Sequence, residues 1–411
     1  KTGRINIFFA DLDNDGNSER ITKNSLTKNH TGVIIYSSEG NIINQFNFEG
    51  NVPERSEMAF YDSDADHKKE CYFFTYSGDS LFLSIIDPFR NSKKSRYLDN
   101  APLEDGEARY TISNILFDEE GPQETRLVFT ISAAFALTPR SIYSYNTQSD
   151  SLVKSPETGN ILRYKIYKTD IDQDGTNEYY GSSHATANFK KPVPYTDHKA
   201  WFMIFDHKLD FEFEPQGYGE FTAQVSTLPV RKNGSGLWAF VCKYKGMNRK
   251  IENYISLYSG IGRFIDSCNL SRMGIQSITD CYLVENKIYI SERNGWIHIF
   301  APNLDLIKKV HSKSLIDSRP YGPFKIDHIE EPFLISANNK LESYIIDVEG
   351  KALTDVNFNG QPDYFSKPVK VNNYMGFSGY TINLIDQTVL FEVKNRRPWL
   401  WFMLKLAGLI L

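Results

Sequence analysis

Cysteine is scarce in this chain, and the cysteines present do not form a metal-binding pattern. The 411 residues include four of them, Cys71, Cys242, Cys268 and Cys281, and no two are spaced as Cys-x-x-Cys. A zinc site is therefore not expected. Cys268 and Cys281 could form a disulfide, but cysteines in strands are more often ordinary core residues. Cysteine usage consequently leaves the redox compartment open.

Other absences narrow the function. The net charge is only −5 and no basic stripe is present, so a nucleic-acid partner is not expected. The motifs GxSxG and HExxH are missing, which predicts a protein without catalytic activity. Helical-period runs of Ala and Leu are scarce, whereas Phe and Tyr are abundant, and this favours strands. Residues 1–5 carry no signal peptide, and we expect the chain to be part of a longer protein.

What the sequence does contain is an acidic loop with the pattern of a cation site, at residues 170–178. Gly175 at position 6 permits a tight turn, and the backbone carbonyl of Thr176 at position 7 would add an oxygen ligand. Calcium takes six to eight oxygens at about 2.3–2.6 Å. An EF-hand would need Glu at position 12, which here is Gly181, and helices at its flanks. The carboxylates at positions 1, 3, 5 and 9 are Asp170, Asp172, Asp174 and Glu178.

The same pattern recurs along the first half of the chain. Residues 62–70 have His67 where the glycine belongs, and residues 117–121 are a degraded version, with Arg126 at position 9, that we expect to hold no ion. Residues 355–363 have too few charges and are interpreted as a turn. Acidic turns also occur at hairpins without any metal, which is the alternative interpretation. The predicted ligands of the first loop are Asp11, Asp13, Asp15, Asn17 and Glu19, and those of the second are Asp62, Asp64, Asp66 and Glu70.

The loops are regularly spaced, which predicts a repeat architecture. Their first positions, 11, 62, 118 and 170, are separated by 51, 56 and 52 residues. We divide the chain into eight units of about 51 residues, each with apolar strands and turns. The unit starts are Ile5, Ser56, Tyr110, Leu162, Phe221, Gln276, Phe324 and Tyr364. This predicts an all-β fold, a β-propeller over residues 1–395, with eight blades preferred and seven as the alternative.

The last three units supply the clearest strand predictions. In the sixth unit we expect strands at 278–284, 287–291, 296–300 and 306–310, with Asn-Gly at 294–295 as a hairpin turn. The seventh unit predicts strands at 324–329, 332–336 and 341–346 and a short edge near Lys351. The eighth predicts strands at 374–377, 381–385 and 388–393. The acidic loops would then join the first and second strands of units one, two and four, on one rim of a ring.

Residues 8–19 and 169–178 resemble the FG-GAP/VCBS family of propeller repeats, through Phe8, Phe9 and Ala10 before the first acidic loop and through both complete acidic patterns. The resemblance covers about half of the chain, because the second unit departs at His67 and the later units lack the motif. It implies a propeller fold and structural calcium held by the loop acids, and it does not imply a ligand.

The C-terminal residues 398–411 are apolar, with Trp399 and Trp401 at their start. They are too short to span a bilayer and predict the start of a truncated transmembrane helix, the alternative being a helix that caps the propeller. The basic residues Lys394, Arg396 and Arg397 would favour a cytoplasmic propeller, but large domains cross membranes regardless of such charges. The calcium loops favour a periplasmic or cell-surface location.

Three functions remain open. The first is a ligand-sensing or interaction domain anchored in the membrane, which is similar in architecture to the sensor region of membrane-bound bacterial histidine kinases. The second is an adhesin or carbohydrate-binding surface protein, and the third is a polysaccharide lyase or glycosidase. An insertion at 182–198, with His184 and His198 near its ends, is expected to be a floppy polar loop, and His298 a hydrogen-bonded strand residue.

Overall fold

The computed structural model describes residues 5–391 apart from 28–29, 54–56, 103–108, 114, 120–123, 134–136, 161, 245–251, 327–328, 339–341, 354–357, 360–367 and 384–387. Every regular element in the described part of the chain is a β-strand, which confirms the all-β prediction. The first sheet contains β1 (Ile5–Ala10), β2 (Glu19–Thr27), β3 (His30–Tyr36) and β4 (Ile42–Glu49). The second contains β5 (Ala59–Tyr61), β6 (Glu70–Ser77), β7 (Ser80–Asp87) and β8 (Ser92–Asn100). The third contains β9 (Tyr110–Ile112), β10 (Leu116–Glu119), β11 (Thr125–Ala133), β12 (Arg140–Asn146) and β13 (Leu152–Lys154).

The second half of the chain continues the pattern with one irregular sheet. That six-stranded sheet contains β14 (Arg163–Thr169), β15 (Glu178–His184), β18 (Gln224–Lys232), β19 (Ser235–Lys243), β20 (Tyr254–Ser259) and β21 (Phe264–Asn269). A small separate sheet pairs β16 (Ala200–Phe202) with β17 (Gln216–Tyr218). Next come β22 (Ile278–Val284), β23 (Lys287–Glu292), β24 (Asn294–Phe300) and β25 (Leu306–Ile316). They are followed by β26 (Ser318–Ile326), β27 (Ile329–Asn338), β28 (Glu342–Asp347) and β29 (Phe358–Asn359). The last sheet has β30 (Val369–Tyr374), β31 (Phe377–Asn383) and β32 (Thr388–Phe391).

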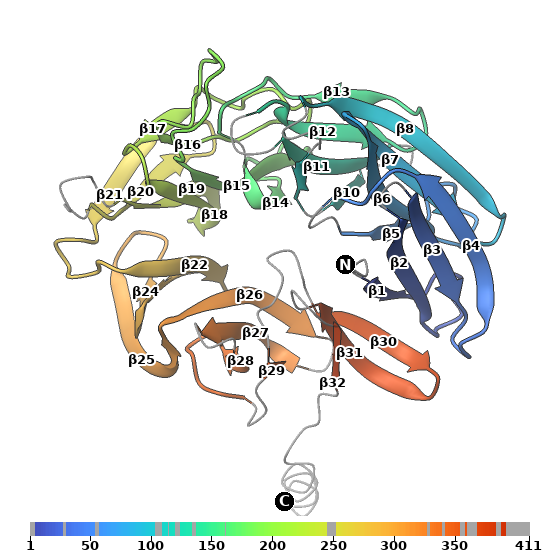
Figure 1. Ribbon diagram of the computed structural model, residues 1–411. Helices are drawn as coiled ribbons and strands as arrows, with labels where there is room; N and C mark the ends of the chain where they lie inside the picture. The colour runs from blue at the N-terminus through green and yellow to red at the C-terminus, as the bar shows by residue number, and fades with distance from the viewer. Residues whose placement is uncertain are drawn as a thin grey trace, which may run out of the picture.

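The sheets are arranged in a ring, with β1, β14, β18, β22 and β26 nearest its centre (Figure 1). Neighbouring strands pair antiparallel, and in most sheets they follow chain order. The ring closes between the first and last sheets, where the Ser18 N–H donates to the carbonyl of Asn372 at 2.7 Å and Phe9 packs edge-on against Tyr374. Radial repetition with closure leaves only short edges, and the fold is a β-propeller.

The blade count of eight stays a prediction. Strand β15 pairs with β18 through Ser183 and His184, so the fourth and fifth predicted units share one sheet. The third strand position of the fourth unit is held by an isolated bridge between Tyr179 and Phe205.

The core consists of apolar side chains packed between neighbouring sheets. Phe74 on β6 meets Phe129 on β11 at 4.9 Å between ring centroids, and Val230 on β18 belongs to the same cluster as Ile290 on β23. Burial of each such side chain stabilises the fold by about 1.5–3 kcal/mol. Because each strand exposes alternate residues to a neighbouring sheet, the apolar runs seen in the sequence become interfaces between blades.

The strand predictions were confirmed for the sixth unit, whose four strands correspond to β22–β25. In the seventh unit the first strand begins earlier, at Ser318. The prediction of a strand at 374–377 was wrong, because Met375 and Gly376 both have positive φ and form the turn between β30 and β31. Phe221 also lies outside a strand, since β18 begins at Gln224.

Several predictions fall wholly or partly outside the described residues. These are the unit starts Ser56 and Tyr364, the turn at 355–363, of which only residues 358–359 are described, and the C-terminal segment 398–411 with Lys394, Arg396 and Arg397 before it. A search of the described residues finds no helix with the length and hydropathy needed to cross a membrane.

Candidate functional site

The three acidic loops join the strands that the spacing predicted, namely β1 to β2, β5 to β6 and β14 to β15. They share one backbone shape. The residue at position 4 has a positive φ in each loop, at Asn14, Ala65 and Gln173. Position 6 also has a positive φ, which Gly16 and Gly175 adopt without strain and His67 adopts against the preference of a residue with a Cβ.

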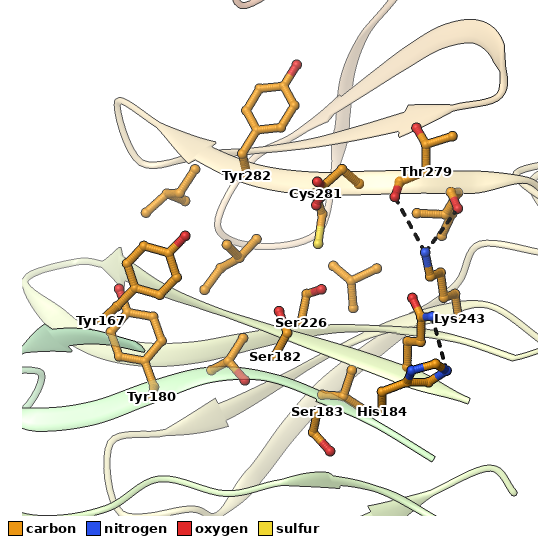
Figure 2. A pocket seen from close by; sticks show the side chains of 18 of the residues that line it. Tyr167, Tyr180, Ser182, Ser183, His184, Ser226, Lys243, Thr279, Cys281 and Tyr282 are labelled. Atoms are coloured by element: carbon orange, nitrogen blue, oxygen red, sulfur yellow. Dashed lines mark hydrogen bonds between the residues drawn. The ribbon is translucent and has the colours of Figure 1, made fainter. Parts of the chain in front are cut away.

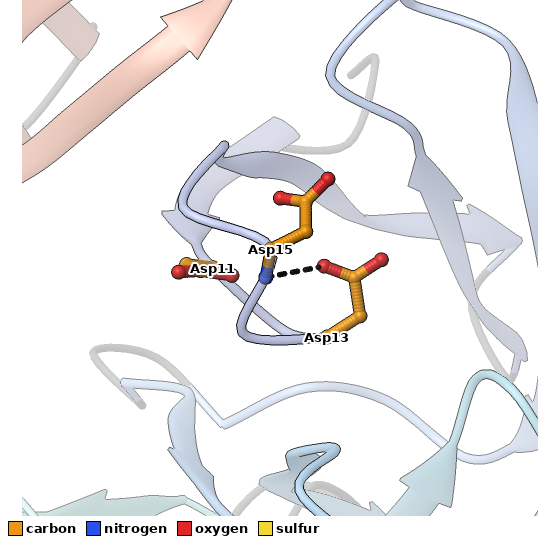
Figure 3. Close-up of side chains that lie close together, drawn as sticks. All are labelled: Asp11, Asp13 and Asp15. Carbon is orange, nitrogen blue, oxygen red and sulfur yellow. Dashed lines mark hydrogen bonds between the residues drawn. The ribbon is translucent and has the colours of Figure 1, made fainter.

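Within each loop, carboxylates gather around one point. Ligand-capable atoms lie within 4.8 Å of one another in Asp11, Asp13 and Asp15, in Asp62, Asp64 and Asp66, and in Asp170, Asp172 and Glu178. Figure 3 shows the first of these groups around its turn.

Two of the predicted ligands form hydrogen bonds within their own loops. In the fourth unit, the Asp174 carboxylate accepts hydrogen bonds from the N–H and the hydroxyl of Thr176, at 2.8 and 2.7 Å, and these bonds lower its pKa. In the first loop, the side-chain amide of Asn17 donates to Asp15 at 3.0 Å. Asp174 lies outside the carboxylate cluster of its loop, whereas Asp15, which accepts the equivalent bonds from Asn17, belongs to the cluster of the first loop.

One buried oxygen in each complete loop lacks a partner among the described residues. The Oδ1 atoms of Asp11 and Asp170, both at position 1, are inaccessible to solvent and receive no hydrogen bond from that part of the chain. The other oxygen of each carboxylate accepts the N–H of the position-6 glycine, at 3.2 Å for Gly16 and 3.1 Å for Gly175. A buried carboxylate oxygen without a donor is unfavourable. In both complete loops the clustered ligand atoms are all oxygens, and one buried oxygen at position 1 lacks a donor. This arrangement fits a hard cation.

The glutamate at position 9 closes each loop by a hydrogen bond to the backbone. Glu19 accepts the N–H of Leu12 at 2.7 Å, and Glu178 accepts that of Ile171 at 2.7 Å. Glu70 accepts the N–H of Ser63 at 2.9 Å. Burial, added to the nearby aspartates, raises the pKa of Glu19 and of Glu178 to about 7. Among these glutamates Glu178 also belongs to a carboxylate cluster, and the role of Glu19 and Glu70 as ligands stays a prediction.

The second loop carries its own cation. The guanidinium of Arg90, in the hairpin between β7 and β8, pairs with Asp64 and Asp66, in the latter case at 2.8 Å. Its Nε also lies 3.6 Å from Asp87, which anchors it. An arginine therefore neutralises the loop that lacks glycine at position 6.

The degraded third loop is likewise satisfied by protein donors. Asp118 is fully buried and accepts hydrogen bonds from Lys168 at 2.6 Å, from Asn177 at 2.8 Å and from the Tyr179 hydroxyl. These donors come from the following unit. Asp118, at position 1 of the degraded loop, therefore has a lysine as its partner, whereas the Oδ1 at position 1 of each complete loop has none among the described residues.

The loops also tie adjacent units together. The buried residues at position 2, Leu12 and Ile171, enter clusters that contain side chains of the next unit. The carbonyl of Asp11 accepts from Lys69 at 2.8 Å, and that of Asp170 accepts from Arg231 at 3.3 Å. Order in a loop is therefore coupled to the contact between two units.

The insertion at 182–198 is irregular but anchored, so the expectation of a floppy loop was wrong. Asp197 is fully buried and accepts hydrogen bonds from the Thr186 hydroxyl and from the N–H groups of Asn188 and Phe189. Arg140 on β12 lies 3.6 Å from Asp197. This ion pair fastens the insertion to the preceding unit. His198 is exposed, whereas His184 belongs to β15.

The remaining predictions concern His298 and the cysteines. His298 is buried and its Nε2 bonds to Glu292 at 2.8 Å, which confirms a hydrogen-bonded strand histidine, while its Nδ1 has no hydrogen-bond partner among the described residues. Burial raises the pKa of Glu292, but hydrogen bonds from His298 and two backbone N–H groups outweigh this effect and lower it. All four cysteines are free, and Cys268 and Cys281 do not pair.

A cavity of about 550 Å³ opens among the strands of four consecutive units, from the fourth to the seventh. Residues of β14, β15, β18, β19, β22 and β26 line it. Figure 2 shows Tyr167 stacked on Tyr180 at one side and Lys243 reaching toward β22 at the other. This site could not be predicted from the sequence, because its polar residues are dispersed over four units of the chain; the one signal was His184 beside an insertion.

Comparisons with known proteins add little. No protein-family model matches the chain, and no curated protein matches it in sequence. The solved Dos1 propeller is similar at a TM-score of 0.46 and 7% identity, covering 92% of this chain and 90% of that one. The designed protein Ika8 is similar at 0.44 and 9%, covering 92% and 95%, and Sqt1 of Saccharomyces cerevisiae at 0.40 and 12%, covering 82% and 83%. None of these similarities carries an argument about function.

Proposed function

We propose that this chain is a calcium-stabilised, non-catalytic β-propeller of eight blades that binds a ligand or protein partner. Two calcium ions would bind, one in the loop at 11–19 and one in the loop at 170–178. The observation that carries this proposal is the buried, unpartnered Oδ1 of Asp11 and of Asp170. Calcium would neutralise the clustered carboxylates and make the two loops rigid.

The loop at 62–70, which the sequence pattern also offered, is left out of the proposal. Arg90 already pairs with Asp64 and Asp66, and a divalent ion would have to displace that guanidinium. The second loop has the same backbone shape as the two proposed calcium loops, but its positive charge comes from the protein itself. It can therefore be compared with them as a loop that needs no ion.

The test is calcium titration with thermal unfolding in calcium and in excess chelator. We expect two ions per chain and a higher melting temperature in calcium. At a calcium concentration 100 times Kd, each site would stabilise the fold by about 2.7 kcal/mol. Magnesium at equal concentration is the control, because it demands octahedral geometry and gives up water reluctantly. Identical melting in calcium and chelator would refute the calcium assignment.

Binding is favoured over catalysis by the composition of the cavity. A glycosidase usually needs two carboxyl groups flanking the bond that it cleaves. Among the described residues that line the cavity, the one carboxylate is Asp280, which is held by Arg319 at 3.2 Å and by the N–H of Cys281 at 2.9 Å. A ligand-binding role thus has more support than the lyase or glycosidase alternative.

The cellular role is proposed from the sequence. The apolar residues 398–411 support a membrane anchor, and the acidic loops support an extracytoplasmic location, as expected for the sensor region of a membrane-anchored signalling protein. The alternative is a surface adhesin or carbohydrate-binding protein. Flotation with lipid vesicles tests the anchor. The full chain should float with the vesicles, and the double variant Leu404→Lys, Leu406→Lys should not.

A further inference from the structure

One wall of the cavity described above is polar. On β18, Gln224 and Ser226 are partly exposed, whereas the alternating Val225 and Thr227 are buried. On β15, Ser182 and His184 are partly exposed and Ser183 is buried. Because alternate residues of a strand point to opposite faces, hydroxyl, amide and imidazole groups of two adjoining strands line one wall. Such groups can exchange hydrogen bonds with a ligand that carries several hydroxyls.

The described residues that line the cavity carry more positive than negative charge. They include the cations Lys243 and Arg319 and one carboxylate, Asp280, with which Arg319 pairs. The Lys243 ammonium points at the carbonyls of Ile278 and Thr279, both at 3.4 Å, which are long hydrogen bonds. Burial lowers the pKa of Lys243, and a bound anion would raise it again.

An aromatic surface lies at the other side of the cavity. Tyr167 is 43% exposed as a residue, and its ring stacks on Tyr180, with ring centroids 5.5 Å apart and planes inclined by 23°. The stacking holds the Tyr167 ring in place, so its outer face is available to an apolar face of a ligand. A pyranose ring has such a C–H face together with hydroxyl edges.

We propose that this cavity binds a sugar acid of one or two pyranose units, with its carboxylate at Lys243 and Arg319 and a sugar face on Tyr167. The volume of about 550 Å³ lies within the range of small-molecule sites, roughly 300–1,000 Å³. This inference rests on the proposed ligand-binding function and names the ligand class, and it does not depend on whether the acidic loops hold calcium.

Titration calorimetry of the full chain with galacturonate, galactose and acetate tests the inference. We expect galacturonate to bind at least about tenfold more tightly than galactose, because only galacturonate makes charge-assisted hydrogen bonds. Acetate should bind more weakly than galacturonate, because it lacks the sugar. Equal affinity for galacturonate and galactose, acetate as tight as galacturonate, or no binding of any of the three would each overturn the proposal.

Matched variants locate the site. Lys243→Met should weaken galacturonate binding about ten- to hundredfold and leave galactose unchanged. Lys309→Met removes the same charge from an exposed position on β25 outside the cavity, and should change neither affinity. Tyr167→Ala should weaken the binding of both galacturonate and galactose. Equal effects of the two lysine variants would place binding elsewhere and refute the site. If Lys243→Met does not fold, the comparison of the three probes on the unaltered chain still decides.

Discussion

Replacing Asp172 by Asn should have opposite effects on stability with and without calcium. Asp172 belongs to the cluster with Asp170 and Glu178, within 4.8 Å, and its Oδ1 accepts the N–H of Asp174 at 3.2 Å. Asn keeps that acceptor and the shape of the side chain, so the substitution removes little besides one negative charge. The change therefore isolates the charge that the proposed ion would neutralise.

The magnitude follows from the geometry. Two unit charges 4.8 Å apart repel by about 1 kcal/mol in water and about 3.5 kcal/mol at an effective dielectric constant of 20. Asp172 is exposed, so the smaller value applies, and the variant in chelator should be about 1 kcal/mol more stable than the unaltered chain. In calcium the lost ligand should weaken the site at least about tenfold, a loss of about 1.4 kcal/mol of binding free energy, which exceeds the gain of about 1 kcal/mol from the removed charge and makes the variant less stable overall.

Direct titration is the better assay for this variant. For a chain of this length, 1 kcal/mol changes the melting temperature by only about 1–2 °C. We therefore expect calorimetric titration to show one tight and one weakened calcium site, and urea unfolding to show the reversal of sign. Asp266→Asn on β21, an exposed aspartate outside the loops, is the matched control and should change neither quantity with calcium. Equal destabilisation of Asp172→Asn in calcium and in chelator would refute the reasoning.

Three other predictions concern the internal ion pairs. Arg90→Ala removes the guanidinium from the second loop and should raise the number of calcium ions bound per chain from two to three. The control Arg263→Ala, at an exposed position, should leave the number at two. An unchanged number for both variants would contradict the role of Arg90 as an internal cation. Because the pKa of Glu292 is lowered in the fold, its carboxylate stabilises the protein above about pH 4.5, and this contribution is lost as the pH falls. The Glu292→Gln variant should therefore be less stable than the unaltered chain at pH 7. In urea unfolding it should also lose less free energy of unfolding on acidification. Arg140→Met should lower the free energy of unfolding by about 3–5 kcal/mol, since it leaves Asp197 charged and buried. Adding Asp197→Asn to this variant should recover part of the loss. Additive losses from the two substitutions would argue against the ion pair.

Local pattern in the sequence determined the features that are built within a few residues of chain. The acidic loops, the strands that flank them and the hairpin at 294–295 could be predicted because spacing, turn residues and side-chain alternation act over short distances. The same reasoning misplaced the strand at 374–377, since a Met-Gly turn resembles a short apolar run.

Tertiary structure alone decided which acids are already neutralised. Arg90 reaches Asp64 across 26 residues, and Lys168 reaches Asp118 across 50. Nothing within the loops at 62–70 and 117–121 predicts these partners, because strand pairing inside one sheet brings the β7–β8 hairpin to the second loop, and packing of neighbouring sheets brings Lys168 to Asp118. For the same reason the cavity with Lys243 and Arg319 exists only in the folded ring, where first strands that are remote along the chain face a common centre.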